Sequence, residues 1–487
     1  MTKLFIPRSP FRLPPSFLSI PVGPPQKTCQ KAPPKTNPSS TKRFLLSKNR
    51  QNTVQNPNRV PLSGLPSSAK QVPGFHCQTS RTVPPNYSHS TVVIQISLFF
   101  ITAFGSQLSA FPPSPCQAQQ TPALWDEKLP VPKSAELLPL EDVEFHVIKH
   151  RVPEQDGYNW LHGVALAWHN NLLITSFGHN AGKENTASEV ANGRISTDNG
   201  STWGPVFQID DGEEENLAVS HGVFLSHEEK LWAFQGAFYN KMEQTHTRAY
   251  LFNEKTKQWQ KLGVVIEDGF WPMQEPLLMN DGNYIMAGIV AKKPDIPGNP
   301  AAVAISHGTD FTKWELVVIP RPDDLRMWGE STVIVDGSHI TNIARYHSKP
   351  LALVSESNDY GRIWTPVAES NLPMTTSKPY AGTLSTGQRY LVCTTTADSG
   401  KARSPLTIAV TRPGEKQFSR IYKIRDAVHH GPGESHPQSR LSYPYAIEHN
   451  EKLYVGYSNS ADRGSNKNSA ELAIIPNSSL NGDKDKP

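Results

Sequence analysis

Two stretches of the chain share one pattern: STDNGSTW at residues 196–203 and SNDYGRIW at residues 357–364. Both fit S-x-D-x-G-x-x-W, which is typical of a turn between strands. The aspartate accepts hydrogen bonds from turn amides, the glycine takes a positive φ, and the aromatic residue packs under the sheet. Weaker copies end at Trp259, Trp314 and Phe418, so the five closing aromatic residues are 50 to 56 positions apart. The motif therefore recurs for structural reasons, and we assign it no catalytic role.

A second repeated element consists of a strand, a short polar turn and another strand. Its six copies are 50 to 63 residues apart and begin at His162, His221, Glu275, Glu330, Tyr380 and Tyr443. Antiparallel units of this length, with almost no helical pattern, predict an all-β fold, a six-bladed β-propeller. Since equivalent blade positions meet around the central channel, we expect these six residues to form a polar ring that lines one pocket.

Composition separates the propeller from the N-terminal part of the chain. Of 487 residues, the first 120 hold 19 of the 43 prolines and 13 Lys and Arg, but no acid. The remainder carries 35 Lys and Arg against 44 acids, so the overall charge of +4 does not indicate a nucleic-acid binder. We expect a disordered Pro/Ser-rich basic region at 1–90, the propeller at 137–478 and a disordered tail at 479–487.

Residues 91–118 resemble a secretory signal. They contain the apolar run TVVIQISLFFITAFG, too short to span a bilayer comfortably, followed by small residues at two positions where a signal would be cut. We therefore expect a secreted or periplasmic protein whose signal starts late in the sequence. The competing interpretations are an organelle transit peptide, a wrongly assigned start, a buried strand and an uncleaved anchor.

The sequence predicts no cofactor. Three of the four cysteines precede residue 120, and Cys393 stands alone in the folded part, which excludes a disulfide framework or cysteine metal site there. No helical histidine pair with a nearby acidic ligand occurs, nor does a Gly-rich phosphate loop or a serine nucleophile elbow. Structural calcium, which some propellers hold, stays open.

The boxes and the six strand pairs resemble the sialidase (neuraminidase) superfamily, whose propellers carry these Asp-box, or BNR, repeats. The resemblance covers about residues 140–476. It implies a glycosidase with a tyrosine nucleophile, a glutamate that assists it, three arginines for the substrate carboxylate and an aspartate as acid/base. A neutral phenol is not repelled by an anionic sugar, but its pKa of about 10 demands a nearby base.

The resemblance assigns roles residue by residue. Tyr443 in SYPYAI matches the nucleophile, with Tyr445 as the alternative, and Glu330 in GESTVIVDG matches its base. Arg345, 15 residues after Glu330, and Arg403 in ARSPLTIAV match arginines that would hold a carboxylate through bidentate contacts. The competing interpretation is structural: an ion pair between Glu330 and Arg345, and a loop cap at Arg403.

Two positions depart from the family pattern. His162 stands where the family has its first arginine and cannot form the guanidinium fork, so Arg440 is an alternative third cation. The family aspartate has no obvious counterpart. The loop at 178–189 offers Glu184 and Glu189, of which Glu184 is nearer the expected place, and the alternative acid/base groups are His162, His179 and His221.

The other ring residues, His221, Glu275 and Tyr380, are expected to bind substrate. Trp271 is expected to stack on a sugar face, although either Trp271 or the preceding Phe270 could belong to the core. The sequence thus predicts a sialidase-like glycoside hydrolase that acts on a terminal acidic sugar, sialic acid or another anionic glycan. The competing hypothesis is a non-catalytic propeller that binds glycan or protein. A glycan or glycoconjugate is the expected partner, no nucleic acid is expected, and the sequence leaves the oligomeric state open.

Overall fold

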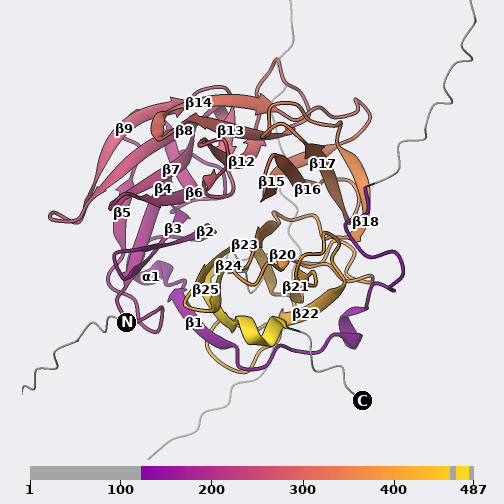
Figure 1. The fold of residues 1–487 in the computed structure, drawn as a ribbon. Helices are drawn as coiled ribbons and strands as arrows, with labels where there is room; N and C mark the ends of the chain where they lie inside the picture. The colour runs from indigo at the N-terminus through magenta and orange to yellow at the C-terminus, as the bar shows by residue number, and fades with distance from the viewer. Residues whose placement is uncertain (1–121, 461–467, 482–487) are drawn as a thin grey trace, which may run out of the picture. The chain divides into compact units, whose positions relative to one another are not determined.

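The structure is a computed structural model that describes residues 122–460 and 468–481. In these ranges six antiparallel sheets are arranged around a common centre (Figure 1), which confirms the predicted six-bladed β-propeller. The two regions expected at 1–90 and 91–118 lie outside the described residues. Helical structure in the described part is limited to α1 (Pro153–Asp156) and the 3-10 turns η1 (Ser134–Glu136) and η2 (Asn477–Leu480), none of which could cross a membrane.

The first two blades are four-stranded meanders in which each strand pairs with the next. Blade 1 contains β2 (Trp160–His169), β3 (Leu172–Asn180), β4 (Glu189–Ser196) and β5 (Phe207–Asp210). Blade 2 contains β6 (Leu217–His227), β7 (Lys230–Tyr239), β8 (Glu243–Asn253) and β9 (Gln258–Ile266).

Blade 3 has an interrupted inner strand, whereas blades 4 and 5 are regular in their strand order. In blade 3, β10 (Phe270–Pro272) and β11 (Leu277–Leu278) both pair with β12 (Tyr284–Val290), which is followed by β13 (Ala301–His307) and β14 (Asp310–Val318). Blade 4 contains β15 (Met327–Asp336), β16 (His339–Tyr346), β17 (Leu351–Ser357) and β18 (Ala368–Pro373). Blade 5 contains β19 (Tyr380–Thr383), β20 (Arg389–Cys393), β21 (Leu406–Val410) and β22 (Arg420–Arg425).

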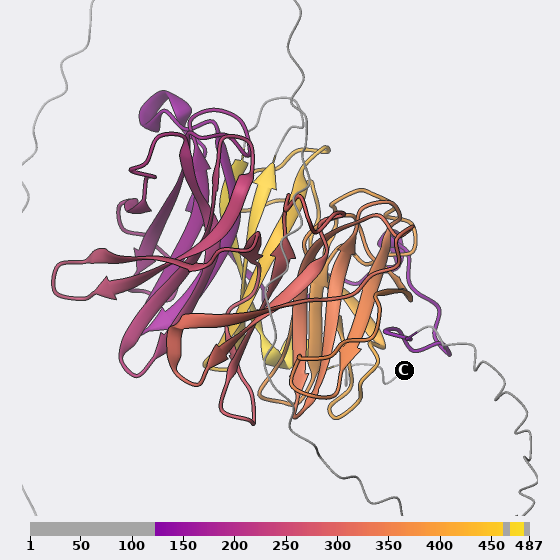
Figure 2. The same cartoon turned by 90° about the horizontal axis from the view of Figure 1, so that it is seen from above.

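Blade 6 closes the ring with a strand from the other end of the domain. Its inner strands are β23 (Arg440–His449), β24 (Lys452–Ser460) and β25 (Asn468–Pro476), and its outer strand is β1 (Glu144–Lys149). In a view at right angles to the first, blade 1 stands beside the strands of blade 6 (Figure 2). Pairing of β1 with β25 joins both ends of the propeller in one sheet, with β1 as the outer edge strand of that sheet.

Ordered contacts begin before residue 137, the start expected from the repeats. The buried Trp125 forms a parallel bridge with Phe418, and the side chain of Asn371 bonds to both the N–H and the carbonyl of Trp125 at 2.9 and 2.8 Å. A second bridge joins Pro139 to Lys423 on the outer strand of blade 5. This segment has no strand repeat of its own, which is why periodicity does not detect it.

Both Asp boxes form turns between the third and fourth strands of their blades. In the second box Asp359 Oδ1 accepts the N–H of Ile363 at 2.9 Å, and Ser357 Oγ accepts that of Gly361 at 3.0 Å. The buried Trp364 donates Nε1–H to the carbonyl of Gly361 at 2.7 Å. The first box has equivalent bonds around Asp198. The turns are therefore structural, as the motif predicts.

Candidate active site

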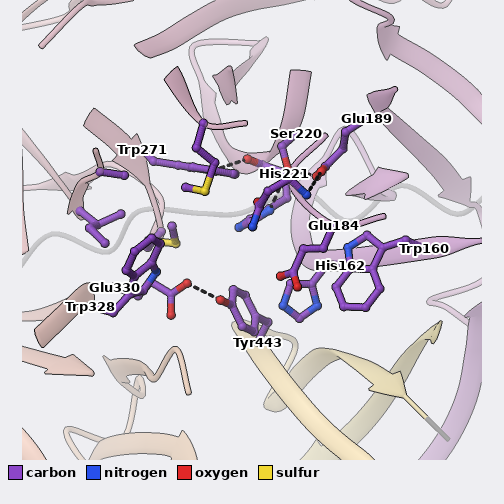
Figure 3. A pocket seen from close by; sticks show the side chains of 15 residues that line it. Trp160, His162, Glu184, Glu189, Ser220, His221, Trp271, Trp328, Glu330 and Tyr443 are labelled. Atoms are coloured by element: carbon purple, nitrogen blue, oxygen red, sulfur yellow. Dashed lines mark hydrogen bonds between the residues drawn. The ribbon is translucent and has the colours of Figure 1, made fainter. Parts of the chain in front are cut away.

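One pocket gathers side chains from blades 1, 2, 3, 4 and 6 (Figure 3). It encloses about 400 Å³ of space between protein atoms, part of it open to solvent. One side is apolar and aromatic, formed by Trp160, Met242, Trp271, Met273, Ile289, Ala291 and Trp328. The polar lining consists of His162, Glu184, Asn185, Glu189, Ser220, His221, Glu330 and Tyr443.

The inner strands are irregular where they reach this pocket. The pairing register shifts at residues 162–165 of β2, 219–222 of β6, 327–331 of β15 and 442–445 of β23. A bulge bends the strand and re-aims its side chains, and bulges are frequent beside active sites. The four shifts contain His162, His221, Glu330 and Tyr443, which all project into the pocket.

Tyr443 is held under backbone strain. Its φ of +56° lies in the left-handed region, which is rare for an aromatic residue and costs of the order of 1–3 kcal/mol. Its buried hydroxyl donates a hydrogen bond to Glu330 Oε1. Burial and the nearby Glu330 carboxylate raise the pKa of Tyr443 well above its usual value, against the opposing effects of Arg345 and Arg403. The phenol is therefore protonated at rest, with an acceptor already in place.

Two arginines flank the phenol. Arg345 Nη1 lies 2.6 Å from Glu330 Oε2 and 3.4 Å from Tyr443 Oη. The guanidinium carbon of Arg403 is 5.9 Å from the centre of the Tyr443 ring, and its Nη2 donates to the carbonyl of Thr376 at 3.0 Å. These contacts place two fixed positive charges beside a neutral nucleophile candidate.

Glu184 lies on the loop between β3 and β4 and points into the pocket (Figure 3). Its side chain keeps contact with solvent, but the surrounding protein limits its hydration and raises its pKa. Arg403 opposes this rise, Glu330 adds to it, and Arg345 and Arg440 oppose it more weakly. A carboxyl group with a raised pKa has the properties of a general acid.

The two pocket histidines are buried and neutral. The His162 ring is 3.6 Å from the Tyr443 ring, centre to centre, and burial, His221 and Arg403 lower its pKa well below the usual value. Burial, and more weakly Lys378, lower the pKa of His221 to about 3. Neither imidazole is charged at neutral pH, so His162 does not supply the charge of the family's first arginine.

The comparisons with known proteins agree with this architecture. A family model described as a BNR repeat-like domain matches residues 170–455, more than half of the chain. The chain belongs to the BNR repeat-like family. No curated protein matches the sequence significantly. The match confirms the BNR-repeat propeller that the sequence predicts, and solved sialidases share its fold.

Solved structures share the fold of this BNR repeat-like propeller at low sequence identity. A Dyadobacter fermentans protein of unknown function is 12% identical, with a TM-score of 0.52 over 69% of this chain and 99% of that chain. Trypanosoma rangeli sialidase is 12% identical, with a TM-score of 0.54 over 71% of this chain and 61% of its own. The NanB sialidase from Streptococcus pneumoniae is 11% identical, with a TM-score of 0.53 over 70% of this chain and 72% of its own. Function must therefore be argued from the site.

The BNR repeat-like propeller does not place Glu275 and Tyr380 in this pocket. Tyr380 is fully buried and donates a hydrogen bond to Glu275, which lines a second cavity with Tyr390 and Glu448. The inner strand of blade 3 is interrupted between β10 and β11, so Glu275 does not occupy a position equivalent to that of Glu330. The expectation of one ring of six residues is wrong for these two.

Neighbouring candidates for the same role differ in their positions. Tyr445 packs against Tyr380, with ring centres 4.6 Å apart, and does not contact Glu330. His179 stacks on Tyr158 at 3.7 Å and is absent from the pocket lining. Phe270 lies in the core, whereas Trp271 lines the pocket and donates Nε1–H to the carbonyl of His221 at 2.9 Å.

Sequence reasoning missed Lys378, which lies behind the pocket in the loop before β19. Its buried Nζ donates to the carbonyl of Pro444 at 2.9 Å and lies over the rings of Tyr380 and Tyr445. Burial lowers the pKa of Lys378 to about 8, with Glu330 and Glu275 opposing. No repeat marks this position. Trp328 was also missed, although it precedes Glu330 by two residues.

The described ranges, 122–460 and 468–481, contain no group of three or more His, Cys, Asp or Glu side chains that could hold a metal ion. Cys393, on β20, is a free buried thiol.

Proposed function

We propose that this protein is a sialidase-like glycoside hydrolase that releases a terminal acidic sugar through a covalent tyrosyl intermediate. The observation that carries the proposal is the buried hydrogen bond from Tyr443 Oη to Glu330, with Arg345 Nη1 3.4 Å from the same oxygen. A phenol with a raised pKa is a poor nucleophile unless a base removes its proton as the bond forms. Glu330 is in place to do so.

In the first step Tyr443 Oη attacks the anomeric carbon while the bond from that carbon to the leaving oxygen breaks. Glu330 takes the phenol proton, and protonated Glu184 gives its proton to the leaving oxygen. In the second step Glu184 takes a proton from water, whose oxygen attacks the anomeric carbon. The bond to Tyr443 breaks, and Glu330 returns the proton to the phenolate. The net reaction is hydrolysis of one glycosidic bond.

The position of the arginines favours a carboxylate close to the reacting carbon. Arg345 and Arg403 both lie beside the Tyr443 side chain. In a sialic acid the carboxylate is bonded to the anomeric carbon itself, whereas in a uronic acid it is bonded to the carbon on the other side of the ring oxygen. Sialic acids and related sugar acids therefore fit the two cations better than uronic acids do. Charge-assisted bonds to such a carboxylate would orient the sugar for attack.

The similar structures support this class of reaction. The Trypanosoma rangeli enzyme has been solved with 2,3-difluorosialic acid as a covalent intermediate, and its TM-score to this chain is 0.51 at 12% identity. The neutral His162 favours the competing function, a non-catalytic propeller that binds glycan or protein, because a third cation is missing from that position. The buried Tyr443–Glu330 contact favours the enzyme.

A Tyr443→Phe variant tests the proposal. The wild-type protein should hydrolyse an aryl sialoside or another member of a panel of anionic aryl glycosides. Tyr443→Phe should lose at least about 100-fold in kcat, because the attacking oxygen is gone. Tyr454→Phe, on the neighbouring strand β24, is the matched control and should keep the wild-type rate. Binding of a glycan without hydrolysis of any panel member would support the competing function.

A further inference from the structure

Beside the proposed nucleophile, three buried polar side chains form a hydrogen-bonded chain. Ser220 Oγ donates to Glu189 Oε1 and lies 3.2 Å from His221 Nδ1 (Figure 3). The exposed fractions of Glu189, Ser220 and His221 are 2%, 0% and 6%. The proposed reaction uses none of these groups, so their arrangement needs a separate explanation.

The two ends of this hydrogen-bonded chain, Glu189 and His221, have different surroundings. Glu189 Oε2 accepts the backbone N–H of Asn185 at 3.2 Å and lies 3.4 Å from Asn180 Nδ2. At the other end, His221 Nε2 has no hydrogen-bond partner among the described residues, and the His221 ring lines the pocket. Buried polar atoms in folded proteins almost always have a partner, so an atom in this position is suited to a ligand.

A serine hydroxyl carries a single proton, which couples the two ends. When Glu189 is ionised, Ser220 donates to it and must accept from His221 Nδ1–H, so Nε2 faces the pocket as an acceptor. When Glu189 is protonated, it donates to Ser220, which then donates to Nδ1. The ring proton must then lie on Nε2, which becomes a donor.

We infer that Glu189 sets, through Ser220, whether His221 presents a hydrogen-bond donor or an acceptor to the substrate. Glu189 and Ser220 are thus positioning residues, and His221 is a specificity-determining residue of the pocket. The change in His221 is independent of the proposed function, whereas its consequence for KM rests on that function.

Within the hydrogen-bonded chain of Glu189, Ser220 and His221, Glu189 is the group that titrates near neutral pH. Burial raises its pKa to about 7, the bond from Ser220 opposes the rise, and the nearby Glu184 carboxyl adds to it. The amides of Asn180 and Asn185 face it without titrating.

His221 stays uncharged through this range because its pKa is about 3, so that only its tautomer changes. The ionisable groups that face it are His162 on β2 and Tyr443 on β23, with ring centres 6.1 and 5.8 Å away, and Lys378. Trp271 on β10 covers its remaining side, 4.9 Å away.

The two tautomers select different oxygens. A carboxylate or acyl carbonyl oxygen has no proton to give, so it binds only the donor form of His221. We therefore expect KM for an anionic or acylated sugar to rise about tenfold between pH 6 and pH 8 if only the donor form binds. The tautomer change should affect kcat little, because His221 is not among the groups proposed to contact the reacting atoms.

The direct test is ¹⁵N NMR of the full-length protein labelled at histidine, recorded from pH 5.5 to pH 8.5. His221, assigned by the loss of its signal in His221→Gln, should change from the Nε2–H to the Nδ1–H tautomer as pH rises. Glu189→Gln should hold the Nε2–H form throughout. Its amide carbonyl must accept from Asn185, which leaves the NH₂ group to donate to Ser220. Ser220→Ala should abolish the pH dependence.

Ser370→Ala, which also removes a buried hydroxyl but lies on outer strand β18, is the matched control. A wild-type His221 tautomer that does not change with pH, or a Ser220→Ala protein that keeps the change, overturns the inference. If the tautomer changes but no anionic glycoside is hydrolysed, the inference on His221 holds and the proposed function fails. If hydrolysis occurs with a constant tautomer, the inference fails and the proposed function holds.

Discussion

At the scale of single residues, Arg403 shows how binding and chemistry can be separated. It lies over the Tyr443 ring but, unlike Arg345, has no hydrogen bond to Tyr443 or Glu330 among those described. Arg403→Ala should therefore act on binding. A hydrogen bond to a charged group is worth about 1.5–3 kcal/mol, which predicts a KM for the anionic substrate about 10- to 100-fold higher. Arg412→Ala, a surface arginine of the same blade, should leave KM unchanged. A lower kcat at constant KM would instead place Arg403 in the chemical step.

Glu189 links the pocket to the pH dependence of stability. Its pKa in the folded protein, about 7, is above the value near 4.5 of an unfolded chain. As pH rises from 4.5 to 7, the unfolded state loses this proton first, so the contribution present below pH 4.5 is lost through this window. The loss amounts to about 2–3 kcal/mol.

The lowered pKa values of the buried His162, His179 and His221 change stability with pH in the opposite sense, so the measurement is a difference between two proteins. The free energy of unfolding in urea should fall for wild type relative to Glu189→Gln by about 2–3 kcal/mol between pH 4.5 and pH 7.5. Parallel pH profiles for the two proteins would show that Glu189 ionises at its ordinary pKa.

At the scale of strands and turns, the Asp box should contribute stability without affecting the site. Asp359 accepts bonds from Ser357 Oγ and from the N–H groups of Arg362 and Ile363 at 2.8, 3.2 and 2.9 Å. Asp359→Ala removes these acceptors and should lower the free energy of unfolding by about 1–2 kcal/mol. Asp323→Ala, at an exposed loop position, should cost little. Thermal unfolding measures both, and a KM or kcat change in Asp359→Ala would contradict the purely structural role.

The strand repeats predict which residues of a blade reach the channel, but not the local path of the chain. Glu330 and Tyr443 could be placed because each begins a strand at a repeated position, and the bulges there aim both into one pocket. Glu275 occupies a similar sequence position, but its strand is interrupted. Lys378 is placed by a loop, and Ser220 matters through its contacts with Glu189 and His221, so neither leaves a periodic signal.

At the scale of the whole molecule, the site depends on the closure of the ring. Tyr443 comes from blade 6, Glu330 from blade 4 and His162 from blade 1, so the pocket exists only while the blades keep their places. The repeats predict six blades but not that the sixth takes β1 from the start of the domain, because this pairing joins strands more than 300 residues apart. The outer strand of blade 6 is therefore the element whose loss should loosen the site most directly.

Ile148 allows this dependence to be tested. It is fully buried on β1 and belongs to the apolar cluster that joins blades 1, 2, 3, 5 and 6. Ile148→Ala should lower the free energy of unfolding by about 2–4 kcal/mol, through lost burial and the cavity left behind. Ile363→Ala removes the same atoms from a side chain that is 75% exposed. This variant should change the free energy of unfolding by less than about 0.5 kcal/mol. In increasing urea, Ile148→Ala should lose hydrolysis and tryptophan fluorescence together, at a lower concentration than wild type. Hydrolysis that outlasts the fluorescence change would show that the pocket does not need a closed ring.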